Sequence, residues 1–301
     1  MNKKTNRLVI SVDLDEWYHV RWATGSQISR WPDSQSFFKE VYNLDKPRGD
    51  IEIPTKEILE LLQEYNIKAT FFILGEVAQY YPHLVKEISK HNHEIASHGK
   101  KHIDLWNYNR QEFYADLKEA KSILEDLTGK QVFGYRAPNL VIEDWIVPVL
   151  NELGFQYDSS VCPSRKLMGK FGSTMALPVK PYYLSDTSFS PGNGPLFEIP
   201  IPVFPFLKLP AATGIMTRVV GTWWSKWTLS YYLKKHDSLY YFHPYEMVTA
   251  PKVDGLKFMQ KLHTRRSGPW MKSAVRNILE EFRDVPKINC VDLMNSFKEK
   301  D

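Results

Sequence analysis

Two aspartates stand one residue apart in the segment SVDLDEWYHV, residues 11–20, directly after the apolar residues LVI. The apolar run predicts a buried strand, and side chains two residues apart on a strand point to the same side. Asp13 and Asp15 would then hold two carboxylates together at the end of that strand. Such a pair can bind a metal ion and take a proton from water. We therefore interpret this segment as the first half of a metal-dependent hydrolytic site.

Other predicted strands are also followed by side chains that bind metals or move protons. The run HEIAS leads into SHGKKH, which supplies His98 and His102 at a spacing that suits two ligands of one metal ion. Arg136 follows VFGY, Asp158 ends FQYD, and His243 follows SLYYF. Each has a plainer explanation when taken alone, since strand-end aspartates often cap turns and a histidine there often belongs to the core.

The joint placement of these side chains favours chemistry over the plainer explanations. In a parallel α/β architecture, the carboxyl ends of the strands meet at one edge, where active sites lie. Two imidazoles and one carboxylate leave coordination positions open for water and substrate. A module that binds metal or sugar without turnover remains an alternative. A glycosidase with two carboxylates would leave His98 and His102 unexplained.

The elements that must position these residues alternate between strand and helix patterns in the first half of the chain. The clearest helix is predicted over residues 110–128, where apolar residues recur three and four apart before Gly129. This alternation predicts a parallel sheet covered by helices, either open or closed into a barrel. Residues 17–50 carry no sustained period and predict a long loop on the substrate side.

Length and composition limit the class of protein. The chain has 301 residues and 43% hydrophobic residues, enough for one large domain. Lysine and arginine exceed aspartate and glutamate by 39 to 35, too small an excess to indicate a nucleic-acid partner. The apolar run before Asp13 is too short for a signal peptide, and no run approaches the roughly 18 apolar residues of a membrane span. Two distant cysteines without CxxC spacing suit a reducing compartment, so we expect a cytoplasmic protein.

The ordered set DLD, SHGKKH, RAPN, YDSS and FHP resembles the polysaccharide deacetylases with NodB homology, carbohydrate esterase family 4. The resemblance covers about residues 8–250, and the flanking sequences are most similar to a branch found among polysaccharide-biosynthesis and intracellular deacetylases. It implies an irregular (β/α) barrel with parallel strands and outer helices. We expect one catalytic domain over residues 1–301, with residues 251–301 as a C-terminal helical extension.

The resemblance also implies a role for each motif residue. Asp13 corresponds to the general base, and Asp15 corresponds to a metal ligand together with His98 and His102. Arg136 corresponds to the arginine that holds the catalytic aspartate, and its charge would favour the ionised carboxylate.

The remaining two motif residues concern the proton donor. His243 corresponds to the general acid, and Asp158 to the carboxylate that orients it. Gly99 stands where the family usually has a serine or threonine after the first histidine, which removes a hydroxyl but no metal ligand. The implied cofactor is a divalent metal, with Zn²⁺ favoured by the ligand set and Co²⁺, Ni²⁺, Mn²⁺ and Fe²⁺ also compatible.

The implied reaction is removal of an N-acetyl group from a sugar in a polysaccharide, an oligosaccharide or a glycan precursor. Removal of a formyl group, or action on a lipid-linked or nucleotide-linked amino sugar, remains an alternative. The tryptophans Trp223, Trp224 and Trp227 suit either a wall that stacks on sugar rings or a core or oligomer contact, and a homo-oligomer is compatible with the sequence.

Overall fold

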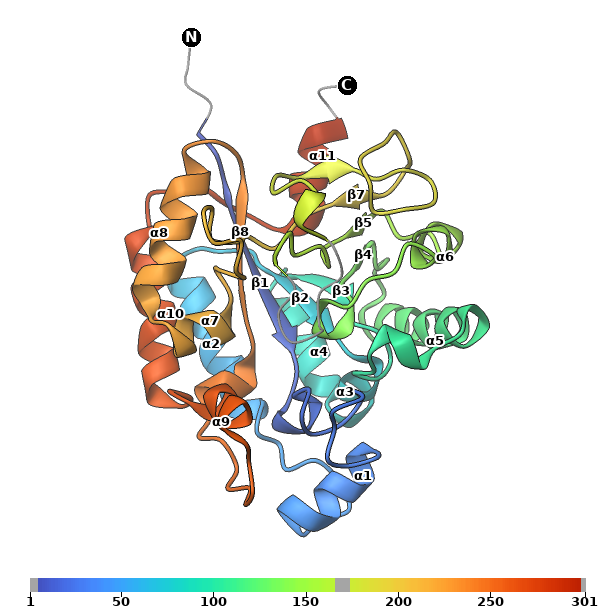
Figure 1. Cartoon of the computed structure of the whole chain (residues 1–301), viewed down its shortest axis with the longest axis vertical. Coiled ribbons are helices and arrows are strands. Elements are labelled where there is room, and N and C mark those ends of the chain that lie inside the picture. Colours follow the sequence, from blue (N-terminus) through green and yellow to red (C-terminus); the bar gives the residue numbers. More distant parts are fainter. Residues whose placement is uncertain (1–4, 166–173, 299–301) are drawn as a thin grey trace.

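The computed structural model of the chain describes residues 5–165 and 174–298, and its strands form one curled sheet with helices around it (Figure 1). The strands are β1 (Leu8–Leu14), β2 (Thr70–Ile73), β3 (Glu94–Ser97), β4 (Gly134–Tyr135), β5 (Tyr157–Asp158), β6 (Tyr182–Tyr183), β7 (Phe197–Glu198), β8 (Ser238–Phe242) and β9 (Lys287–Ile288). Their order is β6-β7-β5-β4-β3-β2-β1-β8, and β9 pairs with β1 outside this path.

All of these strand pairs are parallel except β6 with β7. The predicted α/β class, with parallel strands and outer helices, is therefore confirmed. Among the described strands the path ends at β6 and β8, so the barrel is an open half-barrel. Parallel strands that are covered on both faces read as continuous apolar runs, which explains why all seven residues of β1 are buried.

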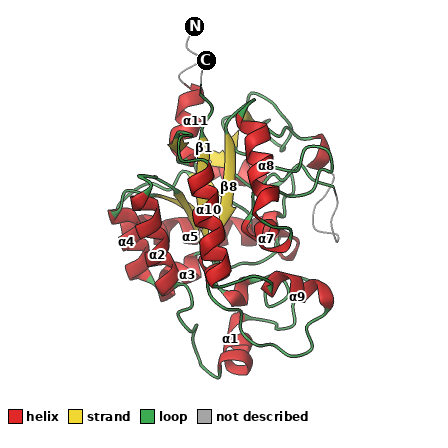
Figure 2. Ribbon diagram, turned by 90° about the vertical axis from the view of Figure 1, so that its left-hand side faces the viewer, coloured by secondary structure: helices red, strands yellow, loops and turns green. Residues whose placement is uncertain are grey.

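The helices enclose the sheet in both views (Figures 1 and 2). They are α1 (Ser34–Phe37), α2 (Glu52–Glu64), α3 (Gly75–Tyr80), α4 (Pro82–Lys90), α5 (Arg110–Thr128), α6 (Ile146–Glu152), α7 (Gly214–Val219), α8 (Thr222–Leu233), α9 (Phe258–Thr264), α10 (Pro269–Glu281) and α11 (Cys290–Lys298). Helix α8 packs against β8 and α10. Within residues 5–165 and 174–298, none of the helices combines the length and the apolar character that a membrane crossing requires.

Helix α5 shows how local sequence signals set an element. Asn109 and Glu112 form a reciprocal capping box, in which each side chain accepts a hydrogen bond from the other residue's backbone N–H. Gly129 ends the helix with a φ of 66°, a conformation that glycine adopts without strain. The helix predicted over residues 110–128 is thus confirmed.

The segment 17–50, for which the sequence predicts a long loop, also has short regular elements. It contains short helical turns, η1 (Trp17–His19), α1 and η2 (Phe38–Tyr42). Trp17, Trp22, Phe37 and Phe38 are buried in the main core. These rings therefore fill the interior of the fold.

The C-terminal extension contains more than helices. Besides α9, α10 and α11 it supplies β9, whose Lys287 and Ile288 pair with Leu8 and Val9 of β1. Val275 and Ile278 of α10 are fully buried, so this helix packs against the core.

Candidate active site

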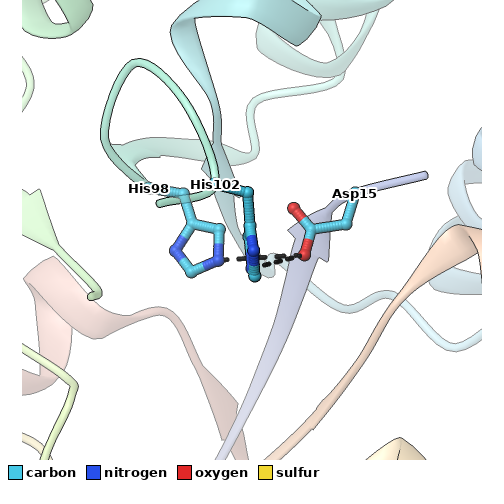
Figure 3. Close-up of side chains that lie close together, drawn as sticks. All are labelled: Asp15, His98 and His102. Carbon is cyan, nitrogen blue, oxygen red and sulfur yellow. Dashed lines mark ion pairs between the residues drawn. The ribbon is translucent and has the colours of Figure 1, made fainter. Parts of the chain in front are cut away.

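Asp15, His98 and His102 form a compact cluster where β1 and β3 end (Figure 3). Asp15 Oδ2 lies 3.4 Å from His102 Nε2 and 3.9 Å from His98 Nε2. One ligand atom from each residue lies within 4.8 Å of the other two, and all three residues are buried. The turn between the histidines begins at Gly99, whose φ of 85° suits glycine. The sequence therefore brings the expected metal-ligand set together.

The chemistry of these donor atoms suits a cation between them. His98 Nδ1 lies 2.7 Å from the carbonyl oxygen of Arg136, which can only accept a hydrogen bond. The proton of a neutral His98 ring therefore sits on Nδ1, and the lone pair on Nε2 faces the Asp15 carboxylate. Among the described residues, none donates a hydrogen bond to the buried Oδ1 of Asp15. Electron-pair donors that face one another in this way fit a divalent metal ion.

Asp13 is held by Arg136 beside this cluster. Arg136 Nη1 donates to Asp13 Oδ1 at 2.5 Å and to Ser11 Oγ at 3.1 Å. Its other nitrogens donate to the carbonyl oxygen and to Oγ of Ser159. The guanidinium is fully buried and lies 3.9 Å from the centre of the Phe72 ring. Because these hydrogen bonds hold the Arg136 guanidinium in place, it fixes the orientation of the Asp13 carboxylate.

His243 approaches the same two aspartates from the end of β8. Its Nε2 lies 3.9 Å from Oδ2 of Asp13 and 3.9 Å from Oδ2 of Asp15. Burial alone lowers the pKa of His243, but the contact with Glu246 and the charges of Asp13 and Asp15 raise it above its ordinary value. A histidine with a raised pKa retains its proton more readily and suits a proton donor.

Glu246 is the carboxylate that contacts the His243 ring, with Oε2 3.3 Å from Nδ1. The same oxygen accepts the backbone N–H of His243 at 2.9 Å, and Oε1 accepts from Arg218 Nε at 2.9 Å. Burial would raise the pKa of Glu246, but the Arg218 charge and His243 outweigh it and lower the pKa to about 2. A Cβ on Gly214 would lie 1.8 Å from Glu246 Oε2, so glycine is required for this approach.

The sequence contains a signal for Glu246 that our interpretation of its motifs did not use. His243, Pro244 and Glu246 occupy the N-cap, first and third positions of the turn η6 (Pro244–Met247). Proline at the first helical position and glutamate at the third are typical of a capped helix start. The spacing therefore indicates that Glu246 turns back toward His243.

Asp158 occupies a different place from the one that the resemblance implies. Its carboxylate accepts hydrogen bonds from the backbone N–H and the hydroxyl of Ser160, and its side chain also bonds to Glu198 on β7. Burial raises the pKa of both carboxyls, and the nearby charge of Asp158 raises that of Glu198 further, so Glu198 is the group that keeps a proton. Asp158 thus holds in place the segment in which Ser159 accepts a hydrogen bond from Arg136. The carboxylate that contacts His243 is that of Glu246.

A pocket of about 280 Å³ opens over the cluster. Its polar lining includes both aspartates and His98, His102 and His243, together with His19, Arg21, Asn139, Thr213 and His263. Apolar residues such as Leu140 and Met216 line the remainder. His102 also borders a larger hollow of about 1090 Å³, lined in part by residues 24–26 and 29–35. The described residues that line the smaller pocket do not include Trp223, Trp224 or Trp227, so these tryptophans do not wall the site.

Known proteins share both the sequence pattern and the fold. Residues 49–157 match the family model for polysaccharide deacetylases, and residues 159–286 match a model for a domain of unknown function, DUF3473. A peptidoglycan-N-acetylglucosamine deacetylase of Bacillus cereus is 32% identical over 102 residues, which cover 34% of this chain and 47% of the relative. The chain thus spans about half the length of this relative.

Two solved structures extend the likeness to nearly the whole chain. A Mycobacterium smegmatis protein assigned to the polysaccharide deacetylases has a TM-score of 0.66 at 17% identity, covering 100% of this chain and 93% of its own. A carbohydrate esterase family 4 pseudoenzyme from Bacillus anthracis has a TM-score of 0.53 at 12% identity, covering 97% of this chain and 66% of its own. Residues 49–157 therefore match a polysaccharide deacetylase domain, and the two solved structures show that the fold extends over the rest of the chain. Because the fold also occurs in a pseudoenzyme, activity must be argued from the site.

Proposed function

We propose that the chain is a metal-dependent hydrolase that removes the N-acetyl group from an N-acetylated sugar. The observation that carries this proposal is the convergence of a three-ligand cluster, an arginine-held aspartate and a carboxylate-backed histidine on one pocket. Each part alone has structural explanations, but together they supply what amide hydrolysis requires.

Asp15, His98 and His102 would hold the metal. A divalent ion bound there supplies a Lewis acid for the acetamide carbonyl and lowers the pKa of water. The cluster geometry does not distinguish Zn²⁺ from Co²⁺, Ni²⁺, Mn²⁺ or Fe²⁺.

The proton transfers would fall to Asp13 and His243. Asp13, oriented by Arg136, takes a proton from the attacking water. His243 gives its proton to the nitrogen of the departing amine, since an amine leaves poorly without one. Glu246 acts on this step as a positioning residue, because it holds the ring through Nδ1 and leaves Nε2 directed at the pocket.

The relatives support a first candidate for the substrate class. The Bacillus cereus relative acts on N-acetylglucosamine of peptidoglycan, so we propose a cell-wall type of amino sugar as the first candidate. The whole chain would form a single catalytic domain, since β1 pairs with β2, which lies inside the residues that match the deacetylase model, and also with β8, which lies beyond them.

The proposal is tested by acetate release from a substrate panel. The panel should include peptidoglycan fragments, N-acetylglucosamine oligomers and nucleotide-linked N-acetyl sugars, with formate measured from the N-formyl analogues. We expect acetate release that is lost on chelation, restored by a divalent metal and abolished in Asp13→Asn. Bound metal without acetate or formate from any candidate would contradict the proposal and favour a binding module.

A further inference from the structure

A second surface, made of residues that do not line the pocket over the metal cluster, exposes large apolar side chains that the proposed reaction does not use. Phe206 and Leu207 are 70% and 46% exposed, and Trp223 and Trp227 on α8 are 56% and 41% exposed. With Tyr231 we call these residues the aromatic face. Soluble surfaces rarely gather large apolar side chains in this way without a partner.

The aromatic face is continuous across two segments of the chain. The ring of Phe206 lies 6.0 Å from that of Trp227 and 6.3 Å from that of Tyr231, and the last two rings stack at 5.5 Å. Beneath them, Phe204 stacks on Trp224 at 3.9 Å and on Trp227 at 4.7 Å. The exposed rings therefore rest on a packed aromatic layer and form one surface.

The backbone holds this arrangement in place. Phe204 N donates to Leu209 O at 2.7 Å, and Lys208 N donates to Phe204 O at 2.8 Å, which closes a tight turn with Phe206 and Leu207 at its tip. Trp224 Nε1 donates to Pro210 O at 3.1 Å and ties α8 to the base of this turn. Because the turn is fixed by hydrogen bonds, the exposure of its tip is a built feature of the fold.

The segment that carries the aromatic face has positive charges without negative ones. Residues 199–236 contain no aspartate or glutamate, but they contain Lys208, Lys226, Lys234 and Lys235. Lys226 pairs with Glu281 of α10, and Lys235 Nζ lies 3.8 Å from the centre of the Tyr231 ring. Lys234 and Lys235 are exposed at the end of α8. The surface therefore complements negative charge.

The chemistry favours a lipid surface over a carbohydrate. Sugar sites place hydrogen-bonding groups against hydroxyls, yet residues 199–236 also contain no asparagine or glutamine. Tryptophan, phenylalanine and leucine with flanking lysines are typical of surfaces that enter the headgroup region of a bilayer. Lysines near such a surface are attracted by anionic lipids.

We propose that the aromatic face docks on a lipid bilayer that carries anionic headgroups. Pro210 connects this surface with the active-site pocket, because its carbonyl accepts the Trp224 hydrogen bond and Pro210 is also one of the residues that line the pocket. Docking would therefore hold the pocket close to the membrane surface. The proposal concerns binding alone and does not depend on the proposed hydrolysis.

The test is sedimentation of the full chain with sucrose-loaded vesicles, one set of phosphatidylcholine and one set with added phosphatidylglycerol. We expect binding to the anionic vesicles that weakens as salt rises. Phe206→Ser combined with Leu207→Ser should weaken the partition at least tenfold, and Lys234→Gln combined with Lys235→Gln should weaken it on anionic vesicles only. Ile53→Ser is the matched control, since Ile53 is 70% exposed on α2 and should leave binding unchanged.

Three results would overturn the proposal. The first is that the wild-type chain stays in the supernatant with both vesicle sets. Alternatively, Phe206→Ser would abolish retention on insoluble N-acetylglucosamine polymer, which would make the face a sugar platform. In the third case, sedimentation velocity would show a dimer that Phe206→Ser dissociates, with no vesicle binding, which would make the occupant a second copy of the chain. Acetate release is not a readout in any arm, so failure of this proposal and failure of the proposed function are distinguishable.

Discussion

The assignment of His243 as proton donor predicts a selective loss in His243→Ala. General-acid transfer contributes a factor of about 10² to 10⁴, which corresponds to roughly 3 to 5.5 kcal/mol of activation free energy. We expect kcat for acetamide hydrolysis to fall by that factor, because the Nε2 that faces Asp13 and Asp15 is removed. Metal content should stay at the wild-type level, since His243 is not one of the clustered ligands.

The leaving group gives this prediction a sharp control. The 4-nitrophenolate of 4-nitrophenyl acetate departs without a proton, so hydrolysis of that ester needs the metal site and Asp13 but no acid. His243→Ala should therefore lose less than about tenfold on the ester while it loses the full factor of about 10² to 10⁴ on the amide. His98→Ala should lose both activities together with the metal. Equal losses on amide and ester in His243→Ala would refute the reasoning.

Glu246→Gln extends the test to the positioning residue. The change keeps the shape and removes the charge that contacts His243 Nδ1. A hydrogen bond to a charged group contributes about 1.5 to 3 kcal/mol, which predicts a loss of roughly tenfold to hundredfold on the amide. The variant also leaves Arg218 buried without its partner, at a cost of about 3 to 5 kcal/mol in stability, so the folded fraction must be measured by circular dichroism at the assay temperature. If Glu246→Gln lost amide and ester hydrolysis to the same extent, Glu246 would contribute to the stability of the fold and not to proton donation.

Three further predictions concern the charges and the packing beside the site. Arg136→Met should lower kcat by at least tenfold and destabilise the fold, because it leaves the buried Asp13 carboxylate without its charged partner. Arg136→Lys keeps the charge but loses the planar guanidinium, so most of the wild-type activity in that variant would contradict a role for the guanidinium geometry. Gly214→Ala should cost about 1 to 3 kcal/mol in urea unfolding, since the added Cβ overlaps Glu246; an unchanged midpoint would contradict this packing. Acid should lower the free energy of unfolding, because the pKa of Glu246 falls from 4.5 to about 2 on folding. The ionised Glu246 carboxylate contributes about 3 kcal/mol to that free energy above pH 4.5, and this contribution is lost as the pH falls toward 2. Urea midpoints of wild type and Glu246→Gln should converge over that range, and a constant difference would contradict the lowered pKa.

The sequence was informative where the geometry is local. Asp13 and Asp15 are two residues apart, and His98 and His102 are four apart across one turn, so their spacing and strand-end positions predicted two imidazoles and a carboxylate at one edge of the sheet. The family resemblance then indicated Asp15 as the carboxylate ligand. The parallel sheet followed from the alternation of strands and helices. These signals depend on residues that are close in the sequence, so they can be recognised without knowledge of the tertiary structure.

The remaining features depend on contacts between distant segments. The strand-end rule located Asp158 correctly at the sheet edge, but it could not show that Glu198, forty residues later on β7, would be its neighbour. Segment 17–50 has no period because its rings pack irregularly into the core. The exposure of Trp223 beside the buried Trp224 is likewise set by the packing of α8.

The most direct test of the account is the metal content of the purified chain, measured together with metal-dependent acetate release. We expect about one divalent metal per chain, its loss in His98→Ala and His102→Ala, and acetate release that follows the metal content. A chain that binds no metal after reconstitution with Zn²⁺, Co²⁺, Ni²⁺, Mn²⁺ or Fe²⁺, while it remains folded, would contradict the central claim.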